Sequence, residues 1–105
     1  MNVLFLCSRN QWRSRTAEHI FRDVDGHCVK SAGTSPSARI RVGPALLNWA
    51  ELIFVMEQKH LAILERKFPD AIIDKNIIAL DVADDYRYLD EELIHELRDG
   101  VAVYL

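Results

Sequence analysis

Residues 2–14 have the sequence NVLFLCSRNQWRS, in which an apolar run gives way to a polar segment. The run from Asn2 to Leu6 predicts a β-strand that is covered on both faces, as strands of a parallel sheet are. From Arg13 onward, apolar residues return at helical spacing as far as Val24, which predicts a helix. The chain therefore begins as strand, loop and helix, with Cys7 at the point where the strand ends.

The rest of the chain repeats this alternation. After an end of the first helix at Asp25-Gly26, further strands are predicted at residues 27–31, 51–56 and 76–80, and further helices at residues 44–49, 57–68 and from about Asp90. This order predicts an α/β fold with three layers, α/β/α, around a four-stranded parallel sheet. We expect a single domain that spans residues 1–105. Ligands of such folds bind at the carboxyl ends of the strands, which directs attention to Cys7.

Composition narrows the choice of partners. Half of the 105 residues are apolar and the net charge is −3, so no basic field favours a nucleic acid or a membrane surface. Arginines nevertheless gather in residues 9–15, a pattern that suits a small anion. With only Cys7 and Cys28, no disulfide framework is predicted, and no signal peptide or membrane span is evident. A cytoplasmic protein with free thiols is expected.

Cys7 and Arg13 are six positions apart, on either side of a loop that enters a helix. Backbone N–H groups at a helix N-terminus attract a phosphate dianion, and an arginine can chelate two of its oxygens. A cysteine in the same field is available as a thiolate nucleophile, to which Ser14 can donate a hydrogen bond. Cys7 as a small buried apolar residue is the competing interpretation.

The segment from Val3 to Ser14 resembles the active-site loop of the low-molecular-weight protein tyrosine phosphatases, whose pattern is an apolar strand followed by C-x-G-N-x-C-R-S. The resemblance continues through four later segments: Ala17-Glu18, Ser31-Ala32-Gly33-Thr34, the stretch from Ala50 to Met56, and Asp84-Asp85-Tyr86. It spans nearly the whole chain. It implies a flavodoxin-like topology and a cysteine-dependent phosphomonoester hydrolase, most simply a protein tyrosine phosphatase with a cysteinyl-phosphate intermediate.

The resemblance also implies roles for individual residues. Cys7 would be the nucleophile, Arg13 would hold the phosphate oxygens, and Asp84 would be the general acid, with Asp85 and Asp90 as the other candidates. The substrate-binding loop would consist of Ser8, Arg9, Asn10, Gln11, Trp12 and Ser14. Asn10 and Ser31 match positions that brace this loop. No cofactor and no metal are expected. The expected partners are a phosphorylated protein or small phosphoester, with phosphate or sulfate able to occupy the loop.

Four departures from the family pattern matter. Arg9 stands in place of a glycine, so either the loop is strained at this residue or Arg9 adds a second cation beside the phosphate. Trp12 replaces a second cysteine, and Arg15 replaces a proline. Only fifteen residues separate Thr34 from Ala50, which predicts a more open substrate pocket. Trp12, Tyr86 and Tyr88 are the aromatic residues available to line it.

Other interpretations remain at this point. An open pocket favours small phosphorylated metabolites or phosphoarginine as substrates, and loss of turnover would leave a phosphate-binding module. An arsenate reductase would need further cysteines, and none follows Cys28. The four histidines are expected to be surface or packing residues, and residues 57–60 to be a solvated helix start. Arg39 and Arg41 could reach an acidic group of the substrate or simply be exposed, and the second is favoured.

Overall fold

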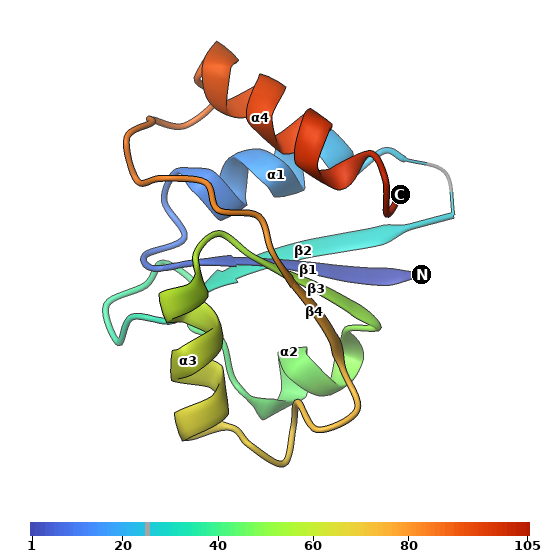
Figure 1. Ribbon diagram of the computed structural model, residues 1–105, viewed down its shortest axis with the longest axis vertical. Coiled ribbons are helices and arrows are strands. Elements are labelled where there is room, and N and C mark those ends of the chain that lie inside the picture. The colour runs from blue at the N-terminus through green and yellow to red at the C-terminus, as the bar shows by residue number, and fades with distance from the viewer. Residues whose placement is uncertain (25) are drawn as a thin grey trace.

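Four parallel strands form one sheet in the computed structural model, which describes residues 1–24 and 26–105. The strands are β1 (Asn2–Cys7), β2 (Cys28–Gly33), β3 (Leu52–Val55) and β4 (Asn76–Ala79), and their order in the sheet is β2-β1-β3-β4 (Figure 1). This order is the flavodoxin-like one that was predicted. β2 runs two residues further than predicted, because Ala32 and Gly33 pair with Leu6 and Cys7 of β1.

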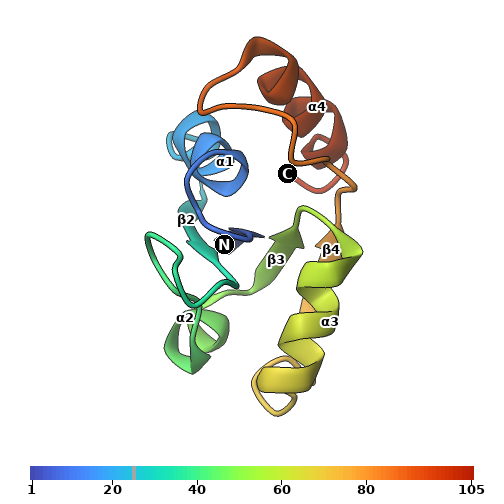
Figure 2. The ribbon, with the colours of Figure 1, turned by 90° about the vertical axis from the view of Figure 1, so that its left-hand side faces the viewer.

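Helices cover both faces of the sheet, which confirms the three-layer prediction. They are α1 (Arg13–Phe21), α2 (Pro44–Trp49), α3 (Gln58–Lys67) and α4 (Glu91–Val101). α1 and α4 lie on one face, and α2 and α3 lie on the other (Figure 2). Asp25, where the sequence predicts the end of the first helix, lies outside the described residues. Within residues 1–24 and 26–105, no helix is both long enough and apolar enough to cross a membrane.

β1 is buried because its side chains alternate between two cores. Val3, Phe5 and Cys7 belong to the core beneath α1 and α4, whereas Leu4 and Leu6 belong to the core beneath α2 and α3. The Phe5 ring is stacked between two other phenylalanine rings, Phe21 and Phe54, at centroid distances of 5.6 and 5.1 Å. A strand that packs on both faces must be apolar at every position, and the sequence of β1 meets this requirement.

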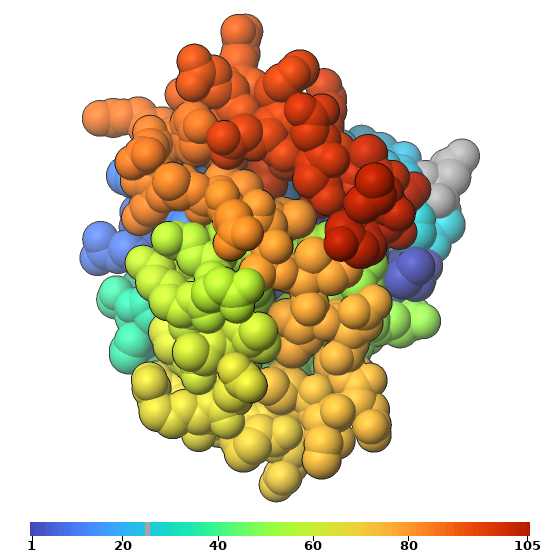
Figure 3. Space-filling view, in the orientation of Figure 1, coloured from blue at the N-terminus to red at the C-terminus, as the bar shows by residue number. Residues whose placement is uncertain are grey.

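The segment after β4 crosses the molecule between two helices. In the space-filling view it appears in orange between yellow-green α3 and red α4 (Figure 3). Leu80 and Val82 hold its start through backbone hydrogen bonds to Val55 and Met56, at 2.9 and 2.8 Å. This path carries residue 84 to the carboxyl end of the sheet.

The segment after β2 packs closely against the loop that follows β1. A Cβ added to Gly33 would lie 2.5 Å from the Ser8 carbonyl oxygen and 2.6 Å from the Ala38 Cβ. Backbone N–H groups of Thr34, Ser35 and Arg39 donate to the carbonyls of Cys7, Ser8 and Arg9 at 2.9–3.0 Å. Only glycine fits at residue 33, because any side chain there would collide with that loop.

Candidate active site

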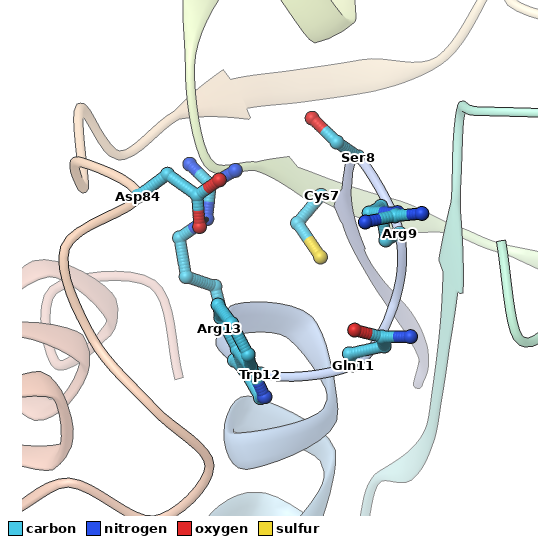
Figure 4. Close-up of a pocket in the computed structure, with 7 residues that line it drawn as sticks. All are labelled: Cys7, Ser8, Arg9, Gln11, Trp12, Arg13 and Asp84. Atoms are coloured by element: carbon cyan, nitrogen blue, oxygen red, sulfur yellow. Dashed lines mark ion pairs between the residues drawn. The ribbon is translucent and has the colours of Figure 1, made fainter.

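Residues 8–12 form a loop between β1 and α1, at the carboxyl end of the central strand. A cavity of about 100 Å³ opens here, lined by Cys7, Ser8, Arg9, Gln11, Trp12, Arg13 and Asp84 (Figure 4). Six of these residues come from one short segment and the seventh comes from the crossing segment after β4. The fold therefore brings together the three residues assigned to catalysis from the sequence, as well as most of the assigned binding residues.

The Cys7 thiol points into this cavity and has two polar neighbours. Its Sγ lies 3.0 Å from the Ser14 Oγ, and the Asn10 backbone N–H donates to it at 3.3 Å. Cys7 is only 3% exposed, so few water molecules can solvate the sulfur. The Asn10 N–H is a donor to the sulfur, whereas in the Ser14–Cys7 pair either atom can donate.

A chain of hydrogen bonds behind the loop makes Ser14 an acceptor from Asn10. Asn10 Nδ2 donates to Ser14 Oγ at 2.7 Å and to Ser31 Oγ at 2.9 Å, and Ser31 donates in turn to Glu18. Because Ser14 accepts from Asn10, its own proton is free for the Cys7 sulfur or for the Ala32 carbonyl, which is 3.3 Å away. Asn10, Ser14 and Ser31 thus lie beneath the cavity rather than on its surface.

The loop reverses direction at Asn10 and not at Arg9. Asn10 has φ 57°, a left-handed conformation that asparagine tolerates better than most residues, whereas Arg9 has no positive φ. The arginine in place of the family's glycine therefore causes no backbone strain. Of the two interpretations of Arg9, the additional cation remains, since its exposed side chain is among those that line the cavity.

Arg13 is almost fully enclosed, at 2% exposure, and several acceptors hold it in place. Its Nη1 donates to Glu57 Oε2 at 2.7 Å and to the Val82 carbonyl at 2.9 Å. Its Nε lies 3.5 Å from Asp84 Oδ1, on the cavity side. The hydrogen bond from Arg13 lowers the pKa of Glu57 below its usual 4.5, although partial burial opposes the shift. A fixed guanidinium can meet a phosphate without first losing conformational freedom.

The prediction of a solvated helix start at residues 57–60 is confirmed for Gln58 and Lys59, which are exposed at the start of α3, but it missed two residues of the site, Glu57 and His60. His60 is fully buried; its Nδ1 accepts from the Glu57 backbone N–H at 3.0 Å, and its Nε2 lies 2.9 Å from Ser8 Oγ. Burial, reinforced by the nearby Arg13 charge, lowers the pKa of His60 from 6.5 to about 4. The imidazole is therefore neutral at neutral pH, with its proton on Nε2, and it donates to Ser8.

A signal for these two residues existed in the sequence. Glu57 follows the third predicted strand directly. In the structure, Glu57 and His60 form reciprocal capping hydrogen bonds at the start of α3. Because β3 pairs with β1, residues after the two strands must lie side by side at the same edge of the sheet.

The three aspartates proposed for proton transfer differ in position. Asp84 lines the cavity, whereas Asp85 does not. Asp90 accepts from the Glu92 backbone N–H at 2.9 Å and caps α4. Asp84 is thus the one of the three that faces Cys7.

Of the aromatic residues proposed to line the pocket, only Trp12 does so. Tyr86 packs against the core, and the Tyr88 ring lies beneath Arg15, whose guanidinium carbon is 4.4 Å from the ring centroid. The two basic residues of the segment after β2 are exposed as predicted, but Arg39 Nε also donates to the Asn10 carbonyl at 3.1 Å. The pocket accordingly has one aromatic wall.

A parallel sheet in this order, with a cysteine–arginine loop after the central strand, defines the fold of the low-molecular-weight protein tyrosine phosphatases, and solved structures of that class superpose over nearly the whole chain. Tyrosine phosphatase Wzb from Escherichia coli K30, in complex with phosphate, has a TM-score of 0.81 and 21% identity, covering 98% of this chain and 94% of that one.

Arginine phosphatases share the same fold. YwlE arginine phosphatase from Geobacillus stearothermophilus has a TM-score of 0.72 and 21% identity, covering 97% of this chain and 86% of that one. A YwlE cysteine-to-serine mutant with a phosphorylated active-site serine has a TM-score of 0.67 and 18% identity, covering 97% and 96%. No protein-family model and no curated protein matches the sequence.

Proposed function

We propose that this protein is a cysteine-dependent phosphomonoester hydrolase of the protein-tyrosine-phosphatase type. One observation carries the proposal: the Cys7 sulfur lies in a cavity of about 100 Å³ that Arg13 and Asp84 also line. A phosphate group has the size and charge for this cavity, because backbone N–H groups at the start of α1 and the Arg13 guanidinium are its donors.

In the first step the Cys7 thiolate attacks phosphorus. The S–P bond forms as the bond from phosphorus to the leaving oxygen breaks, and Asp84 gives its proton to that oxygen. Arg13 and the loop N–H groups stabilise the charge on the three equatorial oxygens, which is where charge gathers in such a transition state. The Ser14 hydroxyl stabilises the thiolate before attack, and its proton is free to do so because Ser14 accepts from Asn10.

In the second step water attacks the cysteinyl-phosphate. Asp84, now ionised, takes a proton from the water as the new P–O bond forms and the S–P bond breaks. Phosphate leaves and the thiolate is regenerated. Support for a phosphorylated intermediate comes from the YwlE mutant, whose active-site serine carries a phosphoryl group. Likewise, the phosphate complex of Wzb supports a free phosphate or sulfate ion in this loop.

The substrate we place first is a phosphotyrosyl protein, since Trp12 offers one aromatic face beside the phosphate site. A second candidate is phosphoarginine in a protein. It is favoured by a pocket whose described lining includes no second aromatic residue, and by the fold likeness to YwlE arginine phosphatase. Either reaction needs a reduced Cys7, which fits a cytoplasmic location.

The experiment is a comparison of two aryl phosphates, p-nitrophenyl phosphate and phenyl phosphate, with four proteins: wild type, Cys7→Ser, Arg13→Lys and Asp84→Asn. Cys7→Ser should abolish turnover, and Arg13→Lys should lower kcat/KM by about a hundredfold, because lysine cannot chelate two oxygens. Asp84→Asn should slow phenyl phosphate by about a hundredfold or more and p-nitrophenyl phosphate less, since p-nitrophenolate leaves more easily without a proton.

A folded wild-type protein that binds phosphate but turns over neither ester would contradict the proposal. If Asp84→Asn slowed both esters equally, Asp84 would not be the general acid. Asp85→Asn is the matched control, and it should leave both rates unchanged. A phosphotyrosyl and a phosphoarginyl peptide of the same sequence then decide between the two substrate candidates.

A further inference from the structure

A second polar pocket lies beside the phosphate loop and is not used by the proposed mechanism. It has a volume of about 190 Å³ and is lined by Arg15, Glu18, His19, Arg22, Arg39 and Tyr88. Three arginines therefore face one carboxylate, on a protein whose net charge is −3. Glu18 is also already engaged, because it accepts a hydrogen bond from Ser31.

Two of the three arginines of this pocket, Arg15 and Arg39, are held in place without being neutralised. Arg15 lies over the Tyr88 ring, and Arg39 Nε donates to the Asn10 carbonyl at 3.1 Å. Neither forms an ion pair with a carboxylate in the part of the chain that the structure describes, and Arg22 has only a 4.0 Å contact with exposed Asp23. Each guanidinium therefore keeps donors free, and a partly ordered arginine loses less freedom when it binds an anion.

The pocket is joined to the phosphate site through the loop itself. The Arg39 backbone N–H donates to the Arg9 carbonyl at 3.0 Å, so this residue contacts the loop at two consecutive positions. Arg15 follows Arg13 by two residues on α1, so its side chain points away from that of Arg13, and the connection to the phosphate site runs through Arg39. Figure 2 views this end of the molecule, where the start of α1 and the segment after β2 lie near each other.

Charge is distributed unequally around the phosphate site. On the α3 side the neighbouring surface pocket is lined by Glu57, Gln58, Lys59, Asp81 and Ala83, so two carboxylates there accompany one lysine. The side toward α1 carries the three arginines. A peptide bound across the site thus meets a more cationic surface toward α1 than toward α3, which would favour one orientation.

We infer that the pocket of Arg15, Arg22 and Arg39 is a subsite for an acidic side chain that flanks the phosphorylated residue of a protein substrate. The inference rests on the proposed function and names its substrate class: phosphopeptides with an aspartate or glutamate near the phosphoresidue. The pocket has room for one carboxylate group, and a protein of net charge −3 offers no wider basic field for a longer polyanion such as a nucleic acid strand.

The test uses matched phosphopeptides that carry either glutamate or glutamine on both sides of the phosphoresidue. Wild-type protein should turn over the glutamate peptide with a kcat/KM about three- to tenfold higher, through KM, and added salt should reduce this preference. The double variant Arg15→Gln/Arg22→Gln should lose the preference and keep its kcat/KM for p-nitrophenyl phosphate, which is too small to reach the pocket. Arg66→Gln on α3 is the control and should retain the preference.

Binding separates failure of this inference from failure of the proposed function. The same peptides are titrated against Cys7→Ser protein by fluorescence anisotropy, so a protein without turnover still yields a preference or its absence. Equal affinity for both peptides, or an acidic preference that survives the double arginine variant, would overturn the subsite. Displacement of the peptide by a single-stranded oligonucleotide, with loss of that displacement in the double variant, would assign the pocket to nucleic acid instead.

Discussion

Arg13 Nη1 lies 2.7 Å from Glu57 Oε2, so a carboxylate at the start of α3 holds the guanidinium that faces the phosphate cavity. Arg13 is 2% exposed and the Glu57 side chain is 32% exposed. Removing one partner of an enclosed ion pair leaves the other charge without compensation. The pair therefore both stabilises the fold and aims the group that would bind the substrate phosphate.

Glu57→Gln tests that positioning role. We expect the free energy of unfolding to fall by about 1–2 kcal/mol, less than for a fully buried pair, because the Val82 carbonyl still holds Nη1. We expect kcat for an aryl phosphate to fall about tenfold, since Arg13 is then drawn toward Asp84. Denaturant titration and steady-state kinetics measure the two effects. Lys59→Gln, which removes the exposed cation 3.5 Å from Glu57, is the control and should change neither. An unchanged kcat for Glu57→Gln would remove Glu57 from the site.

His60 should make stability depend on pH in a defined window. The unfolded chain protonates His60 below pH 6.5, whereas the folded protein does so only near pH 4. Between these values the unfolded state binds more protons than the folded state, so the free energy of unfolding rises with pH. The stability that His60 contributes is therefore lost as the pH falls from 6.5 toward 4. At about 1.4 kcal/mol per pKa unit, the effect is on the order of 3 kcal/mol.

His60→Gln keeps a donor for Ser8 but cannot take up a proton. Urea unfolding at several pH values should therefore show a flatter profile for this variant between pH 6.5 and about 4. Glu57 acts in a different range, because its pKa is lowered from 4.5 and its contribution is lost only below that value. Identical slopes for wild type and His60→Gln above pH 4.5 would show that the imidazole is not the group responsible.

Asn10 combines a conformational role and a hydrogen-bonding role that two substitutions can separate. Both Asn10→Ala and Asn10→Gly remove the bonds to Ser14 and Ser31, but alanine tolerates φ 57° less well than asparagine does, whereas glycine adopts it freely. The alanine variant should be less stable than the glycine variant by about 1 kcal/mol. Both should lose similar activity, because Ser14 is no longer oriented toward Cys7. A wild-type kcat in the Asn10→Gly variant would mean that the Asn10 hydrogen bonds stabilise the fold but do not contribute to catalysis.

The sequence predicts most of this fold because its signals are local. An apolar run such as residues 3–6, buried on both faces, has few structural alternatives, and the alternation of such runs with helical spacing specifies a parallel sheet. The strand ends that differ from the prediction are those that depend on a neighbouring strand. β2 extends to Gly33 because β1 provides a hydrogen-bonding partner there. The fold prediction is confirmed, whereas the catalytic roles of Cys7, Arg13 and Asp84 stay predictions.

The part of the site that sequence reasoning missed depends on pairing between distant segments. Glu57 and His60 look like polar residues at the start of an exposed helix until β3 is placed next to β1, when both come to face the phosphate loop. Arg39 is similar, because its contact with Asn10 exists only after the segment following β2 folds back. The local sequence pattern does not reveal such contacts. The rule that ligands bind at the carboxyl ends of parallel strands predicts only the edge of the sheet where they occur.

A substitution at Gly33 tests the close packing between the segment after β2 and the phosphate loop. In Gly33→Ala the new Cβ would lie 2.5 Å from the Ser8 carbonyl oxygen, which is backbone and cannot rotate away. The loop must shift, and a shift of even a fraction of an ångström moves the N–H groups that would bind phosphate. We expect a loss of about 2 kcal/mol in stability, measured by denaturant titration, and a fall in kcat/KM of about tenfold or more. Gly43→Ala is the matched control, since nothing lies within 4 Å of a Cβ there, and it should be neutral in both measurements. A Gly33→Ala protein with normal activity would mean that residues 34–42 do not determine the shape of the phosphate loop.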